Sequence, residues 1–205
     1  MRSVVTVILF VLTSVALSRV AHAEFSAAVL IRDARSQIGV TTGYDARYQT
    51  LDYPNGDVAI SGGVCTDVVI RALRRQGIDL QQLLHEDMRM HFAEYPTLWH
   101  LKGPDKNIDH RRVPNLQRYF SRRGWALKLP ASAHAQAADT FMPGDFVTWM
   151  LPGNLPHIGI VSDKKTFFGG NYWVLHNVGQ GAQEEDVLAA WPQTGHYRVS
   201  ANTPK

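Results

Sequence analysis

One cysteine and two histidines in this 205-residue chain have the residue types and the setting for nucleophilic catalysis. Cys65 is the single cysteine; it follows Gly62-Gly63 and opens a segment of helical periodicity that ends near Gly77. At a helix N-terminus, unpaired N–H groups and the positive end of the dipole favour a thiolate. We therefore expect the pKa of Cys65 to lie below that of a free thiol. A buried, inert cysteine is the alternative interpretation.

The two histidines lie in strand-like segments further along the chain. His157 opens the run H-I-G-I-V-S, and His176 closes the run Y-W-V-L-H-N. If these strands form an antiparallel hairpin, the two histidines are cross-strand partners at its open end, and the sheet presents both rings to the helix that carries Cys65. Cys65 would then attack, His157 would act as general base and then acid, and His176 would orient His157. A slip of one residue would exchange the faces and put Asn177 in the orienting role.

Four residues are candidates for contacts with a substrate, and each also has a purely structural interpretation. Tyr44 lies in a turn-rich stretch and would either wall a cleft or pack on the surface. Asp67 falls in the first turn of the cysteine helix, where a carboxylate satisfies the helix dipole. Arg111 would either fix its own loop in a salt network or bind a substrate carboxylate with its guanidinium fork. Asn177 is the fourth candidate.

The order of the elements predicts an α+β fold. Amphipathic patterns indicate helices at residues 25–38, 65–76, 80–92 and 113–123. Short segments rich in β-branched and aromatic residues follow, at 125–129, 145–150, 157–162, 172–176 and 196–200. Helices followed by a run of strands are typical of an antiparallel sheet covered by helices. We expect the N-terminus of the cysteine helix to pack on that sheet.

The first 23 residues have the pattern of a cleaved secretory signal. Arg2 precedes an apolar run over residues 4–17, and Ala21-His22-Ala23 supplies a cleavage site. The prediction is a mature single domain of residues 24–205 that is periplasmic or secreted, without a membrane span after cleavage. An uncleaved N-terminal anchor is the alternative. No cysteine follows the apolar run at a position for lipid attachment, and a single cysteine forms no internal disulfide.

The charge of the chain gives no indication of nucleic-acid binding. Without Arg2 and Arg19, the 21 basic side chains become 19, against 18 acidic ones. The basic residues are dispersed, and no basic stripe interleaved with aromatics occurs. No cofactor is predicted, and the sequence leaves the oligomeric state open.

Three motifs in order carry a family resemblance. G-V-C-T-D-V-V, P-G-D-F-V-T-W and L-P-H-I-G-I-V-S-D, followed by W-V-L-H-N, resemble the NlpC-type cell-wall cysteine peptidases. The mature chain also resembles an uncharacterised family of exported bacterial proteins assigned to that superfamily, through stretches such as Y-P-N-G-D and N-I-D-H-R-R-V-P-N. The resemblance implies a papain-like fold and cleavage of an amide bond in peptidoglycan stem peptides, or of another peptide amide.

The chain departs from the NlpC pattern at two places. Val64-Cys65-Thr66 stands where D-C-[SG] is usual, and residues 78–112 form a long insert between nucleophile and base. Both departures bear on the substrate.

Two other function classes remain open. One is a non-catalytic or regulatory wall-binding module of the same fold. The other is a zinc-dependent hydrolase with Cys65, His157, His176 and an aspartate as ligands, although neither H-E-x-x-H nor paired C-x-x-C spacing occurs.

Overall fold

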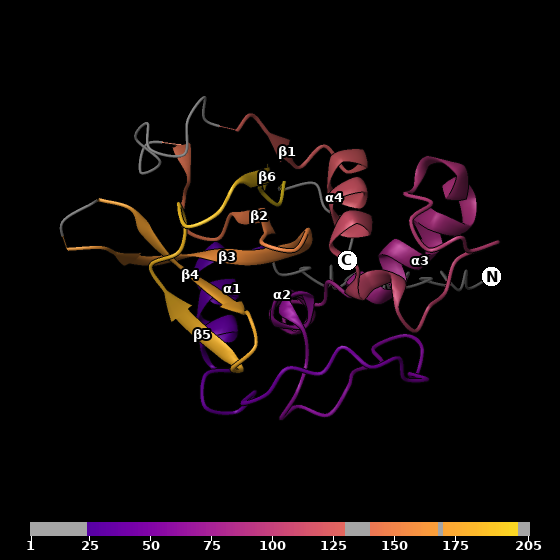
Figure 1. Cartoon of the computed structure of the whole chain (residues 1–205), viewed down its shortest axis with the longest axis horizontal. Coiled ribbons are helices and arrows are strands. Elements are labelled where there is room, and N and C mark those ends of the chain that lie inside the picture. The colour runs from indigo at the N-terminus through magenta and orange to yellow at the C-terminus, as the bar shows by residue number, and fades with distance from the viewer. Residues whose placement is uncertain (1–23, 130–139, 168–169, 201–205) are drawn as a thin grey trace, which may run out of the picture.

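A layer of helices covers one face of an antiparallel sheet (Figure 1). The computed structural model describes residues 24–129, 140–167 and 170–200. Within these ranges the sheet has six strands in the order β1-β6-β2-β3-β4-β5, so the predicted α+β class with an antiparallel sheet is confirmed. The expected signal segment, residues 1–23, lies outside the described residues.

In the described residues, the four α-helices lie close to the expected ranges, and two short 3₁₀ helices were not predicted. They are α1 (Ala27–Arg35), α2 (Cys65–Arg74), α3 (Leu80–His91), η1 (Phe92–Glu94), η2 (Asp109–Arg111) and α4 (Val113–Arg122). Over the described ranges, no helix is both long enough and apolar enough to span a bilayer.

The strands include one that the sequence did not predict. They are β1 (Ala126–Leu127), β2 (Phe146–Leu151), β3 (Leu155–Lys165), β4 (Tyr172–Asn177), β5 (Ala182–Glu185) and β6 (Gln193–Tyr197). β5 was not expected because its sequence, A-Q-E-E, lacks the β-branched and aromatic residues typical of strands.

Helix α2 lies at the centre of the core. Every residue from Cys65 to Leu73 is buried, because the helix packs between α1 and strands β3 and β4. Its buried Arg71 is paired with Asp57 at 2.8 Å and donates a further hydrogen bond to Thr41. A buried cation without such partners would be strongly destabilising. Arg71 therefore also anchors the loop that leads into Cys65.

The side chains of β3 alternate between two apolar clusters. Ile158 and Ile160 point to the helices and pack with residues of α2. Val161 points to the opposite face, where Trp149 of β2 and Leu188 form a second cluster. Because alternation has a period of two, His157 lies on this second face, away from the helices.

Asp145 of the P-G-D motif joins β2 to β6. Its buried carboxylate accepts hydrogen bonds from Arg198 at 2.6 Å and from His196 at 2.6 Å. Burial raises the pKa of Asp145, but the bonds from Arg198 and His196 outweigh it and hold the pKa below its usual value. This part of the motif is structural.

Gly159 is predicted to be essential for packing between β3 and β4. A Cβ at this position would lie 2.4 Å from Cγ1 of Val174 and 3.2 Å from Cβ of His176. We expect Gly159→Ala to lower the free energy of unfolding by about 1–3 kcal/mol, the usual range for overpacking. Urea unfolding at equilibrium measures this loss.

Gly103→Ala is the matched control, because a Cβ at Gly103 meets no atom within 4 Å. We expect it to change stability by less than about 0.5 kcal/mol. Equal stability of the two variants would contradict the packing argument.

Candidate active site

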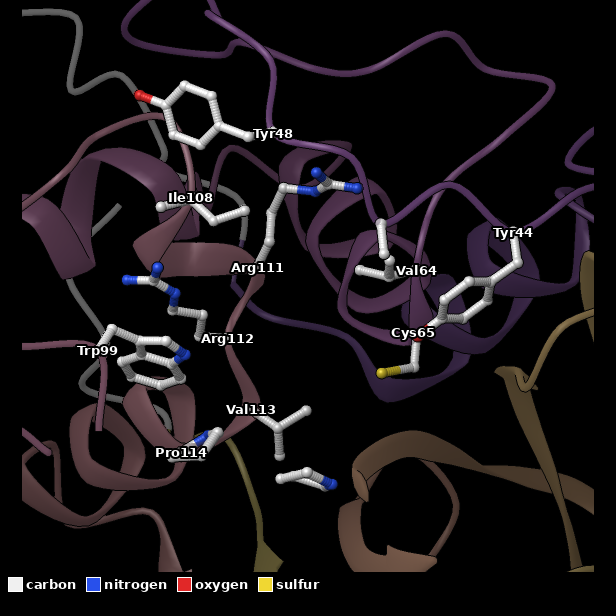
Figure 2. A pocket seen from close by; sticks show the side chains of 12 residues that line it. Tyr44, Tyr48, Val64, Cys65, Trp99, Ile108, Arg111, Arg112, Val113 and Pro114 are labelled. Atoms are coloured by element: carbon white, nitrogen blue, oxygen red, sulfur yellow. The ribbon is translucent and has the colours of Figure 1, made fainter. Parts of the chain in front are cut away.

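Cys65 opens onto a cavity of about 400 Å³ (Figure 2). Cys65 is the first residue of α2, and it is only 4% exposed. Most of the wall is apolar or aromatic, and two arginines complete it. The lining residues are Tyr44, Ala46, Tyr48, Val64, Cys65, Trp99, Ile108, Arg111, Arg112, Val113, Pro114 and Pro156.

The thiol is surrounded by hydrogen-bond donors. The backbone N–H of Ile158, from β3, and those of Thr66 and Cys65 interact with the sulfur and favour the thiolate. The hydroxyl of Tyr44 also forms a hydrogen bond with Cys65. Burial, with smaller contributions from the neighbouring Cys65 and Asp67, raises the pKa of Tyr44 to about 12, so this hydroxyl keeps its proton as a donor.

Burial dominates the ionisation of Cys65. It raises the pKa of the thiol to about 12, and the nearby carboxylate of Asp67 acts in the same direction. The N–H groups lower the pKa, but by less than burial raises it. The expectation of a lowered pKa is therefore wrong, because the argument from the helix N-terminus did not include the depth of the site.

Three side chains form a hydrogen-bonded chain beside β3. Nε2 of His157 lies 2.8 Å from Nδ1 of His176, and Nε2 of His176 lies 2.9 Å from a carboxylate oxygen of Glu185. A carboxylate only accepts hydrogen bonds, so Nε2 of His176 carries a proton and its Nδ1 accepts. Nε2 of His157 must then be the donor, which leaves Nδ1 of His157 with a free lone pair.

The histidine pair is enclosed by tryptophans. The ring of His157 lies 5.8 Å from Trp149 and 5.9 Å from Trp191, measured between centroids. Burial, with a smaller contribution from His176, lowers the pKa of His157 to about 3. Burial also lowers the pKa of His176, while Glu185 acts in the opposite direction. Both rings are therefore neutral at physiological pH.

The register of β3 and β4 differs from the expected one. Ile160 pairs with Leu175, so His176 lies opposite Gly159, and His157 is its diagonal neighbour on the same face. The rings still meet, because Gly159 has no side chain between them. They lie on the face opposite α2, so the prediction that both rings face the cysteine helix is wrong. Cys65 instead approaches β3 at the backbone of Ile158, the residue after His157.

Asn177 connects the sheet to the loop before Cys65. Its side-chain amide donates to the carbonyl oxygens of Gly43 and Gly63, both at 3.1 Å, and its own oxygen accepts from the backbone of Gly179. Because Asn177 alternates with His176, it points to the helix side of β4. The hydrogen-bond partner of His157 is thus His176. Asn177 instead holds the loop that leads into Cys65.

Asp67 and Arg111 form a buried ion pair beside the cavity. Asp67 accepts the backbone N–H of Val64 at 2.6 Å, and Arg111 donates to the same carboxylate at 2.9 Å. Arg111 also donates to the carbonyls of Asp45 and Arg47. Asp67 is not among the residues that line the cavity, whereas Tyr44 and Arg111 are.

Glu185 is the site residue that the sequence did not predict. It lies on β5, whose pairing with β4 places Glu185 opposite Val174 and diagonal to His176. No local pattern identifies it, because its position depends on a strand that has no strand-like composition.

The described residues contain no group of three or more His, Cys, Asp or Glu side chains arranged to hold a metal ion. The zinc ligand set considered from the sequence is therefore not brought together in this part of the chain.

The raised pKa of the thiol predicts an unusual pH dependence of alkylation. Cys65 is the only cysteine, so iodoacetamide reports on this thiol alone. We expect the rate constant to rise about tenfold per pH unit between about pH 6 and about pH 9, because the thiolate fraction grows with pH below the pKa. Glutathione is the control, and its rate levels off above its own pKa. A rate that is independent of pH below about pH 7 would indicate a resting thiolate–imidazolium pair and would contradict the assignment.

Comparison with known proteins places the chain in a family. Residues 31–199 match the family described as a domain of unknown function, DUF1287. The chain is also 54% identical over 165 residues to the uncharacterized protein YijF of Escherichia coli (strain K12), and the match covers 80% of this chain and 78% of YijF. The family match covers the cavity, both histidines and Glu185. The chain belongs to the DUF1287 family.

Proposed function

We propose that this protein is a cysteine hydrolase that cleaves amide bonds in the stem peptides of peptidoglycan. The observation that carries the proposal is that Cys65 opens into a cavity and receives the backbone N–H of Ile158, the residue directly after His157, whose ring ends the hydrogen-bonded chain Glu185–His176–His157. A nucleophile, a base and a group that orients the base are the parts that acyl transfer requires. His157 presents the unprotonated nitrogen that a base needs.

Acylation begins from a neutral pair. As the sulfur of Cys65 attacks the carbonyl carbon, the carbonyl π electrons move to the oxygen and the thiol proton passes to Nδ1 of His157. Because the ring of His157 rests on the opposite face of β3, the proposal requires it to turn toward the cavity for this transfer. When the C–N bond breaks, Nδ1 returns the proton to the leaving amine. The thiol and the ring are both neutral at rest, so proton transfer accompanies the attack.

Tyr44 and the start of α2 supply the donors for the oxyanion. The hydroxyl of Tyr44 and the backbone N–H of Cys65 both converge on the sulfur, so both also lie beside a carbonyl attacked by it. Deacylation follows by attack of water on the thioester, with His157 taking the proton of the water. His157 then returns that proton to the departing sulfur, which restores the thiol.

The choice of substrate rests on the resemblance to the NlpC-type peptidases and on the N-terminal segment. A nucleophile at a helix N-terminus, an antiparallel sheet, and a base in an H-x-G strand followed by a polar residue on the next strand are the parts of a papain-like arrangement. A signal peptide at residues 1–23 would deliver the mature protein to the periplasm or the exterior, where the wall lies.

Digestion of purified peptidoglycan tests the proposal. The mature chain, residues 24–205, is incubated with peptidoglycan, and the released fragments are identified by mass spectrometry. We expect new amide-cleavage products from the wild type, and a reduction of about 10⁴-fold or more in Cys65→Ala and His157→Gln, because each removes one member of the reacting set. His91→Gln, a change at a histidine outside the site, should leave the digest unchanged.

Identical digests from wild type and Cys65→Ala would contradict a thiol mechanism. Binding to peptidoglycan without cleavage would instead support a wall-binding module. Cleavage that is abolished by a chelator but insensitive to alkylation of Cys65 would support a metal-dependent hydrolase.

A further inference from the structure

We propose that Arg112 forms a carboxylate-binding subsite at the end of the cavity opposite Cys65, so that the preferred substrates carry a free acidic group. This inference deepens the proposed function, because the bound acid is a substrate only if the protein is the proposed hydrolase. The binding site itself stands on the geometry of the cavity.

The cavity has two chemically different ends. Figure 2 shows Tyr44, Val64 and Cys65 on one side. Trp99 and Arg112 lie on the other side, with Tyr48 and Ile108 nearby. A molecule that places its amide at the thiol therefore extends toward the tryptophan and the arginine.

Arg111, one of the candidate carboxylate ligands from the sequence, has four of its five N–H donors engaged within the protein. Its Nε and Nη2 are bound to Asp67, Nη2 also donates to the carbonyl of Asp45, and Nη1 donates to the carbonyl of Arg47. The side chain is 2% exposed. Arg111 thus holds the wall of the cavity in place.

Arg112 is held rigidly and keeps donors available. Its guanidinium lies 4.1 Å from the centroid of the Trp99 ring, and Nη1 binds Asp109 at 2.8 Å. Within the described residues, Nε and Nη2 of Arg112 have no hydrogen-bond partner, and the side chain is 17% exposed. Stacking on an indole and a single ion pair fix the planar fork, so little conformational entropy is lost when a carboxylate binds.

The charges around Arg112 favour an anion over a cation. None of the described residues that line the cavity is acidic. Asp109 is 1% exposed and lies behind Arg112; its other oxygen accepts the backbone N–H of Asp105. The charged groups on the cavity wall are therefore cationic, while Asp105, which accepts the hydroxyl of Tyr48, is not among the lining residues.

The walls next to Arg112 are apolar or already hydrogen-bonded. The hydroxyl of Tyr48 donates to Asp105 at 3.0 Å and accepts from Asn107 at 2.9 Å, so mainly its ring is available to a ligand. Ile108 and Trp99 supply further apolar surface. The ligand that fits is an acid whose carboxylate is attached to an apolar or aliphatic chain.

Two thiol-reactive probes that differ in one group test the subsite without any turnover. N-(5-carboxypentyl)maleimide and its primary amide share a flexible chain that reaches across the cavity, but only the acid carries a charge. Their rates of reaction with Cys65 in the intact mature protein are divided by their rates with glutathione. We expect the acid to react about tenfold faster than the amide, since a charge-assisted hydrogen bond favours it.

Arg112→Gln should reduce this preference to near one. Arg89→Gln removes the same charge at an exposed position of α3 outside the cavity lining, and should leave the preference unchanged. Arg112→Lys keeps a cation for Asp109 but loses the stacked fork, so it should fold and show a reduced preference. This variant decides the question if Arg112→Gln does not fold.

An equal preference in wild type and in the folded Arg112 variants, or no preference in wild type, would overturn the subsite. Because the readout is covalent labelling, it is independent of peptidoglycan cleavage. A protein that labels as expected but cleaves nothing would retain the subsite and lose the proposed hydrolase.

Discussion

The carboxylate of Glu185 is the constraint on which the chemistry of the site depends. It only accepts hydrogen bonds, so it determines which nitrogens of His176 and His157 carry protons. The arrangement requires that two rings on neighbouring strands meet, and Gly159 leaves the space for them. Trp149 and Trp191 enclose the ring of His157, whereas the side chain of Glu185 remains 45% exposed.

Burial gives the site a different resting state from that of an exposed thiol at a helix start. The donors around the sulfur act against desolvation but do not overcome it, and both the thiol and His157 are neutral. In the proposed mechanism, the thiol and His157 stay unreactive until a carbonyl occupies the cavity, and proton transfer to His157 then accompanies attack. The same depth of the site protects Cys65, the only cysteine, from oxidation.

Much of the fold and part of the site could be predicted from the sequence. Amphipathic periodicity located α2, α3 and α4 to within about two residues, because each has one strongly apolar face. The strand-like settings of His157 and His176 predicted a histidine pair, and the two rings do meet; the role of Cys65 as a nucleophile stays a prediction. β5, and with it Glu185, had no local signal, since it becomes a strand only through pairing with β4. Both Arg111 and Arg112 line the cavity, and tertiary contacts decide which of them keeps donors available for a ligand. Arg111 forms an ion pair with Asp67, whereas Arg112 stacks on Trp99.

The proton positions in the histidine pair show most directly whether Nδ1 of His157 can act as a base. In mature protein labelled with ¹⁵N in histidine, long-range proton–nitrogen NMR spectra distinguish protonated from unprotonated ring nitrogens near neutral pH. We predict that Nε2 is protonated and Nδ1 is unprotonated in both His157 and His176. Replacing Glu185 by Gln should weaken or reverse this pattern, because an amide can also donate to Nε2. A proton on Nδ1 of His157 in the wild-type protein would mean that this nitrogen cannot accept the thiol proton, which would contradict the proposed mechanism.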